Sequence, residues 1–485
     1  MKRFLLILLV VISASSLMLV SANLRAADVQ KRSVQDVIHL VLKNYPTLKI
    51  ARLEIDRARQ EFAKIESQLG WIASAQTGIS RDVGAFNIPS ERFDVAAGIG
   101  STQDSGHAVE LTGQYSYEDG ESVAFPSIAN PSERAALDLN YRIPLAQGED
   151  NPSYQQGLVS AEAGLETTEA SRIKQIDALV QQTISLYYDI SNTYMRIKDA
   201  DEAIRRADRL YNFVKKNAGL GLSESKDLLI VDALRSAKIS DRDNLLIIWS
   251  QQRSGLNRLL GLEPNSDFEP VISTKKNTPE RDAALEQVYA INPDILIQIA
   301  QLKTADASIE LANDAKKDKL DVVFSVGARN TSGDTATGSV SDSEWAGGAR
   351  LEYQFSLDQR GFDAGIYQAM LDKQTIEEEV ARIKRDLKYD VNGLLEQIAQ
   401  NQIAAISSKK RLTIERKKVK EAFDRYRVGR ADTNELIDNE NSLFLASLLY
   451  ETRKIELARK HTELALLLGS LWDRQLLLDG GYGKN

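Results

Sequence analysis

Near its C-terminus the chain reads Tyr426-Arg-Val-Gly429-Arg-Ala-Asp-Thr-Asn-Glu435-Leu-Ile-Asp438, a pattern typical of a tight turn between two helices. A glycine at such a turn supplies the positive φ that other residues adopt only with strain. Asp432 and Glu435 have the three-residue spacing of a capping box at the start of the following helix. We therefore predict a helical hairpin that turns at Gly429.

The hairpin occurs twice in the sequence. Gly221 and Gly429 each precede another glycine, Gly261 and Gly469, and the offset between the copies is 208 residues at both ends (429 minus 221, and 469 minus 261). The same register at both ends of so long a segment indicates an internal duplication.

The duplication divides the chain into two repeats flanked by shorter segments. We predict a signal peptide at 1–22, a first repeat at 23–262, a connector at 263–284, a second repeat at 285–471 and a C-terminal tail at 472–485.

Proline placement permits very long helices in both repeats. No proline occurs from Ser153 to Glu263 or after Pro293, and proline breaks helix interiors. We predict long helices at 153–217 and 362–428, return helices at 225–260 and 433–469, and shorter helices at 33–68 and 293–317. A helix of about 65 residues is on the order of 100 Å long, more than a globular domain needs.

Apolar stripes mark the packing faces of the helices in the second repeat. One stripe, from Ile376 to Ile398, has an average step of about 3.67 residues, which suits a straight helix. Another steps by seven residues, which favours left-handed supercoiling. Its members are Leu412, Val419 and Tyr426 before the turn, and Leu436, Leu443, Tyr450, Leu457 and Leu464 after it.

Ahead of each long helix the apolar period changes from about 3.6 to two, which predicts β-strands. The strands fall at about 71–145 in the first repeat and 320–356 in the second. The first repeat is longer here by two strand-like segments between Phe93 and Tyr117, which could join a barrel, extend outside it or form a surface loop. Alternating strands in an exported protein suit a transmembrane barrel shared by several chains. A small soluble sheet at the end of a helical rod is the alternative.

Composition restricts the function classes. Lys2-Arg3 and the apolar run that follows have the form of an export signal, with an uncleaved anchor as the alternative. The net charge of −8, or −10 without the two N-terminal charges, argues against nucleic acid as a partner. There is no cysteine, the three histidines are scattered, and no catalytic arrangement is visible. We expect neither an enzyme nor a bound cofactor or metal.

Taken together, the repeated hairpins and strands resemble the TolC-like outer-membrane efflux proteins, from about Ser33 to Leu471. The Tyr426–Asp438 stretch resembles the turn at the periplasmic tip of that family's second hairpin. The resemblance implies a mainly α fold with a small β part: a long α-helical hairpin barrel plus a shared transmembrane β-barrel, formed by a homotrimer with 12 strands in all. It also implies localisation in the outer membrane of a Gram-negative bacterium, with a long periplasmic extension.

The resemblance also implies a gate at the periplasmic tip. Acidic residues ring the closed tip in that family, and the matching positions are Glu435 and Asp438, which lie on one helix face. Six carboxylates from three chains would favour cations in a narrow aperture. The other interpretation is that these acids only cap the helix, since acidic residues stabilise a first helical turn.

Further tip residues carry over from the resemblance. Tyr426 matches the family's latch tyrosine, and Asp227 matches the first-hairpin acid with which it pairs. Ala431 occupies the position of the latch arginine, and Arg430 is displaced by one residue. The turn glycines Gly221 and Gly429, with their neighbours Leu222, Val428 and Arg430, form the expected docking region for an adaptor.

These features predict an outer-membrane channel of a tripartite efflux or type I secretion system. The implied partners are a periplasmic adaptor (membrane fusion) protein, an inner-membrane pump of RND or ABC type, and outer-membrane lipid. The alternative is a structural or adaptor-type periplasmic coiled-coil protein without a pore. An adaptor, however, would carry compact β-domains at one end of a single hairpin. A secreted hydrolase is opposed by the missing catalytic arrangement.

Overall fold

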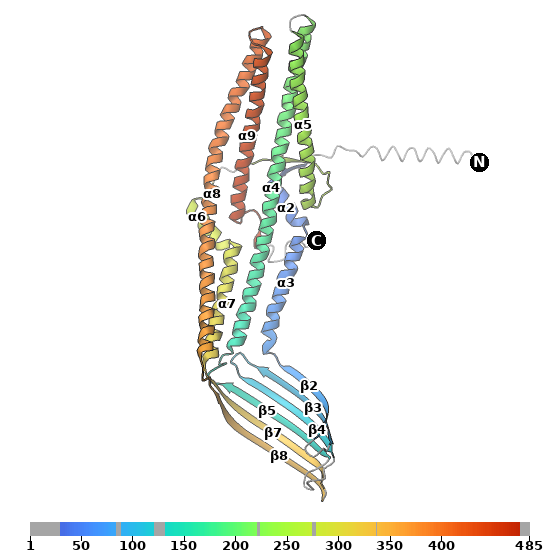
Figure 1. The fold of residues 1–485 in the computed structure, drawn as a ribbon, viewed down its shortest axis with the longest axis vertical. Helices are drawn as coiled ribbons and strands as arrows, with labels where there is room; N and C mark the ends of the chain where they lie inside the picture. The colour runs from blue at the N-terminus through green and yellow to red at the C-terminus, as the bar shows by residue number, and fades with distance from the viewer. Residues whose placement is uncertain are drawn as a thin grey trace, which may run out of the picture. The chain divides into compact units, whose positions relative to one another are not determined.

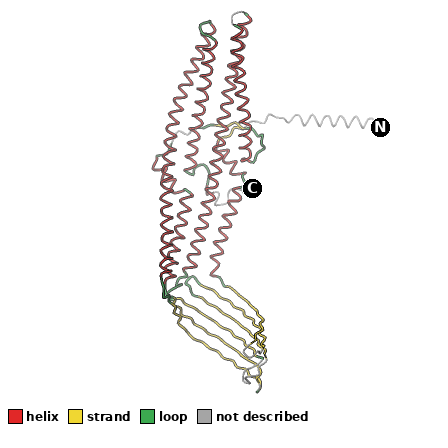
Figure 2. The backbone as a smooth tube through the Cα atoms, in the orientation of Figure 1, coloured by secondary structure: helices red, strands yellow, loops and turns green. Residues whose placement is uncertain are grey.

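The computed structural model describes residues 30–83, 89–120, 131–220, 224–273, 278–335 and 337–475. The predicted signal peptide, Gly221, Leu222 and the end of the predicted tail lie outside these ranges. The chain forms two compact units, one from residues 1–52, 172–293 and 384–485 and the other from 53–171 and 294–383. Figures 1 and 2 show the helices and strands of each unit.

Two helical hairpins dominate the first unit. They are α4 (Pro152–Gly219) with α5 (Ser225–Leu260), and α8 (Arg360–Arg427) with α9 (Thr433–Leu467). The N-terminal parts of α4 and α8 belong to the second unit. These bounds lie close to those expected from the proline gaps and apolar stripes.

The seven-residue stripe forms the seam between α8 and α9. One buried cluster joins Leu412 and Val419 of α8 to Leu443 of α9, and a second joins Ile398 to Leu457 and Leu464. Side chains at this spacing lie on one helix face and fill the holes of the partner helix. The stripe expected from the sequence is therefore the packing face.

Polar contacts join α4 to α9 along the seam between the two hairpins. The hydroxyls of Tyr188 and Thr462 lie 2.7 Å apart, and the hydroxyl of Ser447 donates to Asp199 at 2.8 Å. Arg206 pairs with Glu440 at 2.7 Å, with both side chains mostly buried. Buried polar pairs of this kind fix the register of two helices, because a slip would leave each partner unsatisfied.

The predicted connector is partly structured. It contains β6 (Phe268–Val271), which pairs in parallel with β1 (Gln30–Ser33). The fully buried Tyr187 of α4 holds this two-stranded sheet, since its hydroxyl lies 2.9 Å from the carbonyl of Arg32 and 3.0 Å from that of Val271. Four-residue strands have too little period-two pattern to be seen in the sequence.

The shorter helices of each repeat are divided at a proline. The predicted 33–68 helix is two helices, α2 (Val34–Asn44) and α3 (Thr47–Glu66), interrupted at Tyr45-Pro46. In the second repeat α6 (Arg281–Ile291) precedes α7 (Pro293–Lys316) in the same way. Proline cannot donate the helical hydrogen bond and disfavours helical geometry in the residue before it. The prediction of one continuous helix at 33–68 is therefore wrong.

The second unit contains a six-stranded antiparallel sheet in the order β2-β3-β4-β5-β7-β8 (Figure 1). Its strands are β2 (Ile72–Val83), β3 (Pro89–Thr102), β4 (Ala108–Gly120), β5 (Ser132–Pro144), β7 (Lys319–Thr335) and β8 (Gly338–Gln354). The segment left open by the sequence forms β3 and β4, which lie inside the sheet between β2 and β5. Each repeat contributes to one continuous sheet, because β5 of the first pairs with β7 of the second.

Asp199 gives the first unit a pH-dependent stability. Burial raises the pKa of its carboxyl to about 6, and the carboxylates of Glu451 and Glu202 add to the effect against the Ser447 hydrogen bond and Arg206. The folded state therefore keeps this proton up to about pH 6, whereas the unfolded chain loses it near pH 4. Its contribution to stability is complete below about pH 4 and is lost as the pH rises through about 6.

We expect Asp199→Asn to stabilise the protein at pH 7.5 by about 1 kcal/mol, because the neutral amide avoids the buried charge and still accepts from Ser447. The gain disappears towards pH 4. Urea unfolding of the wild type and of Asp199→Asn between pH 4 and 8 measures this difference in the free energy of unfolding. Asp424→Asn, at an exposed acid of α8, is the control. Parallel pH profiles for wild type and Asp199→Asn would contradict the assignment.

Candidate functional site

The turn of the second hairpin has the predicted geometry. Gly429 adopts φ 72°, its N–H donates to the carbonyl of Tyr426, and the N–H of Arg430 donates to the carbonyl of Arg425. Asp432 is the N-cap of α9 and accepts from the N–H of Glu435 at 2.7 Å. These bonds satisfy backbone groups that a helix end leaves unpaired.

A chain of hydroxyls connects the two hairpins at this turn. The hydroxyl of Thr433 donates to the carboxylate of Asp227 on α5 at 2.9 Å and lies 3.2 Å from the hydroxyl of Tyr426 on α8. A carboxylate only accepts, so the single proton of Thr433 points to Asp227, and Tyr426 must donate to Thr433. The structure thus brings the predicted Tyr426 and Asp227 together through a third residue. Thr433 is 4% exposed and was not singled out from the sequence.

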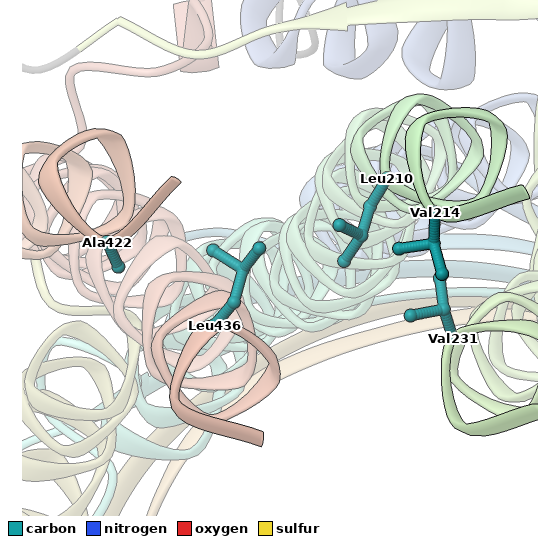
Figure 3. Close-up of a cluster of buried hydrophobic side chains, with 5 residues drawn as sticks. All are labelled: Leu210, Val214, Val231, Ala422 and Leu436. Atoms are coloured by element: carbon teal, nitrogen blue, oxygen red, sulfur yellow. The ribbon is translucent and has the colours of Figure 1, made fainter. Parts of the chain in front are cut away.

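A hydrophobic cluster packs against Tyr426 of this chain of hydroxyls, and Figure 3 shows the five side chains of the cluster. It contains one or two residues from each of the four hairpin helices: Leu210, Val214, Val231, Ala422 and Leu436. The ring of Tyr426 packs against it, 6.0 Å from the ring of Phe213. The polar chain therefore sits at the edge of a packed core, where water competes weakly for its hydrogen bonds.

The two predicted gate acids differ in their surroundings. Glu435 pairs with Arg425 at 2.9 Å, and the same guanidinium donates to the carbonyl of Arg430 at 3.2 Å. Asp438 is exposed, and no described residue forms an ion pair with it. Glu435 is held within its own hairpin by Arg425, a residue that the sequence reasoning missed.

Other predicted tip residues lie at the surface. Val428 is 61% exposed, and the side chain of Arg430 is exposed while its carbonyl holds Arg425. Gly221 and Leu222 are outside the described residues. Within the described part of the chain, no group of three or more acidic or histidine side chains is arranged to hold a metal ion.

The second unit has a different surface of functional interest. On β3 the apolar Phe93, Val95, Ala97 and Ile99 are exposed, and the alternate residues from Asp94 to Gly100 are half-buried. On β5, Leu137 and Leu139 are exposed while Asp138 is half-buried. A sheet of a soluble protein has the opposite arrangement, with its apolar face covered.

The strand register places these apolar side chains on one face across all six strands. Ile99 pairs with Leu111, Leu111 with Leu139, and Leu139 with Val326, so these residues share a face. Aromatic residues occur on this face towards both ends of the strands: Tyr141, Phe324 and Tyr353 towards the end joined to the helices, and Phe93 and Tyr117 towards the other end. Tyr115 and Trp345 lie nearer the middle of the same face. An apolar band between aromatic girdles is typical of the lipid-facing side of a transmembrane barrel.

The opposite face of the sheet is polar and concave. A cavity of about 600 Å³ has lining residues from every strand of the sheet. They include Ser74, Gly98, Glu110, Arg142, Val323 and Arg350. Residues that far apart in the strand order line one cavity only if the sheet curves around its polar side. The sheet is therefore a curved wall with an apolar outer surface and a polar inner one.

Comparison with known proteins identifies the fold. No protein-family model matches the chain, and no curated protein matches it in sequence. Several solved structures match the chain in fold. The outer-membrane channel OprN matches at TM-score 0.64 with 17% identity, over 90% of each chain. VceC, an outer-membrane protein of Vibrio cholerae, matches at 0.64 with 13% identity, over 90% of this chain and 96% of its own. The Neisseria gonorrhoeae MtrE outer-membrane channel matches at 0.63 with 18% identity, over 91% and 90%.

The chain has the fold of these outer-membrane channels. The resemblance stated from the sequence is thus confirmed for the fold, over nine-tenths of the chain. No helix in the described part of the chain is long and apolar enough to cross a membrane.

We expect Thr433→Val to loosen the tip, because the substitution keeps the shape of the side chain and removes the link between Asp227 and Tyr426. The loss of about 1 kcal/mol corresponds to roughly five-fold faster amide exchange in the first turns of α5 and α9. Hydrogen exchange followed by mass spectrometry measures it. Thr413→Val is the matched control, since that hydroxyl is exposed and bonds only within its own helix, to Lys409. Unchanged exchange in Thr433→Val would contradict the linking role.

Proposed function

We propose that the protein is a passive outer-membrane channel of a tripartite efflux or type I secretion system. Three copies form a duct from the periplasm to the exterior. A periplasmic adaptor couples it to an inner-membrane pump of RND or ABC type, and that pump supplies the energy.

The observation that carries this proposal is the exposed apolar face of the six-stranded sheet. Trp345 is 80% exposed and Ile79 85%, and the polar side chains lie on the concave side. Exposing such a face to water is unfavourable by about 25 cal/mol for each Å² of apolar surface. Lipid removes this penalty, and the outer membrane is where β-barrels are found. A polar lumen then lies behind the apolar wall.

The alternative, a periplasmic coiled-coil protein without a pore, does not account for this sheet. A soluble end domain would bury the apolar side chains of β3 and β5 against another layer. A sheet built from both repeats also differs from the single β-domain region of an adaptor.

In the proposed duct, the tip of the second hairpin is the periplasmic gate. Three copies bring Glu435 and Asp438 around one axis, and the exposed Asp438 contributes an unpaired negative charge from each chain. Arg425 offsets the charge of Glu435 and holds it to the turn. Tyr426, Thr433 and Asp227 keep the two hairpins of one chain together, so that opening requires these hydrogen bonds to break.

The turns themselves are the proposed docking surface for the adaptor. Leu220 is 64% exposed beside the first turn, where Gly221 and Leu222 follow, and Val428 is exposed beside Gly429 in the second. Small apolar protrusions at both hairpin ends suit the tips of a helical partner.

The test is single-channel recording of the purified protein in planar bilayers. We expect the wild type to conduct. Glu435→Ala combined with Asp438→Ala should give larger conductance and weaker cation selectivity, because the repulsion in the aperture and its negative field are removed.

Glu378→Ala is the control, since it removes an exposed acid of α8 far from the turn in sequence. It should conduct as the wild type does. If neither the wild type nor the double variant conducts, the duct proposal is wrong. If both conduct equally and with equal selectivity, the duct stands and the gate assignment fails.

A further inference from the structure

The two edges of the six-stranded sheet are its incomplete part. β2 and β8 each have one neighbour among the described strands, whereas β3, β4, β5 and β7 have two. β1 and β6 pair only with each other and do not cover either edge. Each edge therefore presents a row of unpaired backbone N–H and C=O groups.

β3 and β4 are integral strands and not an appendage. β3 is paired with β2 from Ile72–Gly100 to Val83–Pro89, and β4 with β5 from Ala108–Arg142 to Glu118–Ser132. Neither strand can leave the sheet without breaking a full ladder on both sides.

The turn between β3 and β4 is also tied to its surroundings. Gly106 adopts φ 79° and lies so close to Gly148 that a side chain there would meet the Gly148 carbonyl. Asn151 donates to the carbonyl of Gln103 at 3.1 Å, and His107 lies 2.8 Å from the hydroxyl of Tyr141. These contacts anchor the turn of the inserted pair at this end of the sheet.

The six strands of the described residues cannot close a ring by themselves. Six strands are fewer than the eight of the smallest known outer-membrane barrels. In lipid an open edge is not tolerated, because each unpaired backbone group costs several kcal/mol. The apolar face continues to both edge strands, through Ile79 on β2 and Trp345 on β8, so both edges lie in the same membrane layer. The element that pairs with each open edge must therefore itself be a strand with one apolar face.

A second copy of this chain meets that requirement. An even number of strands leaves β2 and β8 running in opposite directions, so β8 of one copy can pair antiparallel with β2 of the next. The contact is head-to-tail and repeats until the ring closes. Its apolar and polar faces continue those of the sheet without interruption.

We propose that β8 of each copy pairs with β2 of the next and that three copies close an 18-stranded barrel, three times six, in place of the 12 strands implied by the family resemblance. The number of copies rests on the trimer in the proposed function. The presence of six strands in each copy does not depend on the trimer.

The consequence is a wide exit. Barrel diameter grows about linearly with strand number, so 18 strands give about 1.5 times the diameter of 12 and roughly twice the cross-section. Barrels of 16–18 strands enclose an aqueous channel. The extra pair of strands also adds charged groups of both signs to the lumen: Arg92 and Asp94 on β3, and Glu110 and Glu118 on β4. The lumen is thus a hydrated pore with no apolar constriction from this pair.

The junction can be tested by disulfide crosslinking, because the chain has no cysteine of its own. One cysteine is placed at Thr77 on β2, and a second is moved along β8 over positions that share its face: Ser343, Trp345, Gly347, Ala349 and Leu351. Facing positions in antiparallel strands bring β-carbons within disulfide reach. We expect one register to give reducible bands of two and three linked chains and none larger.

Controls separate this junction from chance encounters. Cysteines at Glu344, Ala346 and Gly348 lie on the polar face and should link poorly to Thr77→Cys. Variants with a single cysteine should give no band of three linked chains. Ala75→Cys with Ala97→Cys, facing positions within one chain, should link without a change in the number of chains. A ladder ending at two chains, or no link in any register, would overturn the proposed barrel.

Strand number is tested by electron microscopy of the purified assembly and by a deletion. Removing residues 84–131 joins β2 to β5, which end and begin at the same end of the sheet. This variant should form a barrel about one-third narrower than that of the wild type. It should also exclude polyethylene glycols, added from the exterior side, that are small enough to enter the wild-type pore. Eighteen strands in the wild-type image support the proposal.

The outcomes also distinguish this proposal from the proposed function. A conducting trimer with 12 strands, with β3 and β4 outside the ring, refutes the wide barrel and leaves the duct intact. A protein that neither conducts nor forms a ring refutes the duct itself.

Discussion

The arrangement of side chains on the six-stranded sheet constrains everything else in this protein. A strand with period-two alternation has one apolar face, and that face must be removed from water. Here no layer of the described chain covers it, and the sheet curves so that its polar side is concave. In the proposed barrel, lipid satisfies the outer face and a closed ring satisfies the backbone groups of the edge strands. The further copies of the proposed barrel follow from these two requirements together.

The hairpin tips show a different balance of forces. The four helices there are held by a small apolar cluster and by the hydroxyl chain through Thr433, each of modest energy. Arg425 restrains Glu435 within its turn, and Asp438 has no ion-pair partner among the residues that the structure describes. The proposed gate needs a closed state that is favoured by only a few kcal/mol, so that a partner that binds the open state can shift the equilibrium. One or two hydrogen bonds of about 1 kcal/mol each, beside like charges, fit that range.

Much of the fold could be predicted because it depends on periodic or conformational signals. The seven-residue stripe specified the α8–α9 seam, and the glycine with positive φ at 429 specified the turn. The shorter helices are divided at Pro46 and Pro293. The predicted 33–68 helix nevertheless continued across Pro46. The pairing of β1 with β6 could not be seen, because four residues carry no usable period. Thr433 was missed for a similar reason: its role depends on Asp227, which is 206 residues away in the chain.

The unequal lengths of the two repeats also have a physical explanation. An antiparallel sheet can be enlarged by a hairpin but not by a single strand. One added strand would leave a parallel neighbour that needs a long crossover connection. Inserting β3 and β4 between β2 and β5 preserves the alternation of direction, the alternation of faces and the antiparallel relation of the two edges. The insertion lies wholly within the second compact unit, so the four hairpin helices keep their stripes and their turns unchanged. The width of the proposed barrel can therefore vary by pairs of strands, while the helical hairpins and the proposed gate keep the same number of elements.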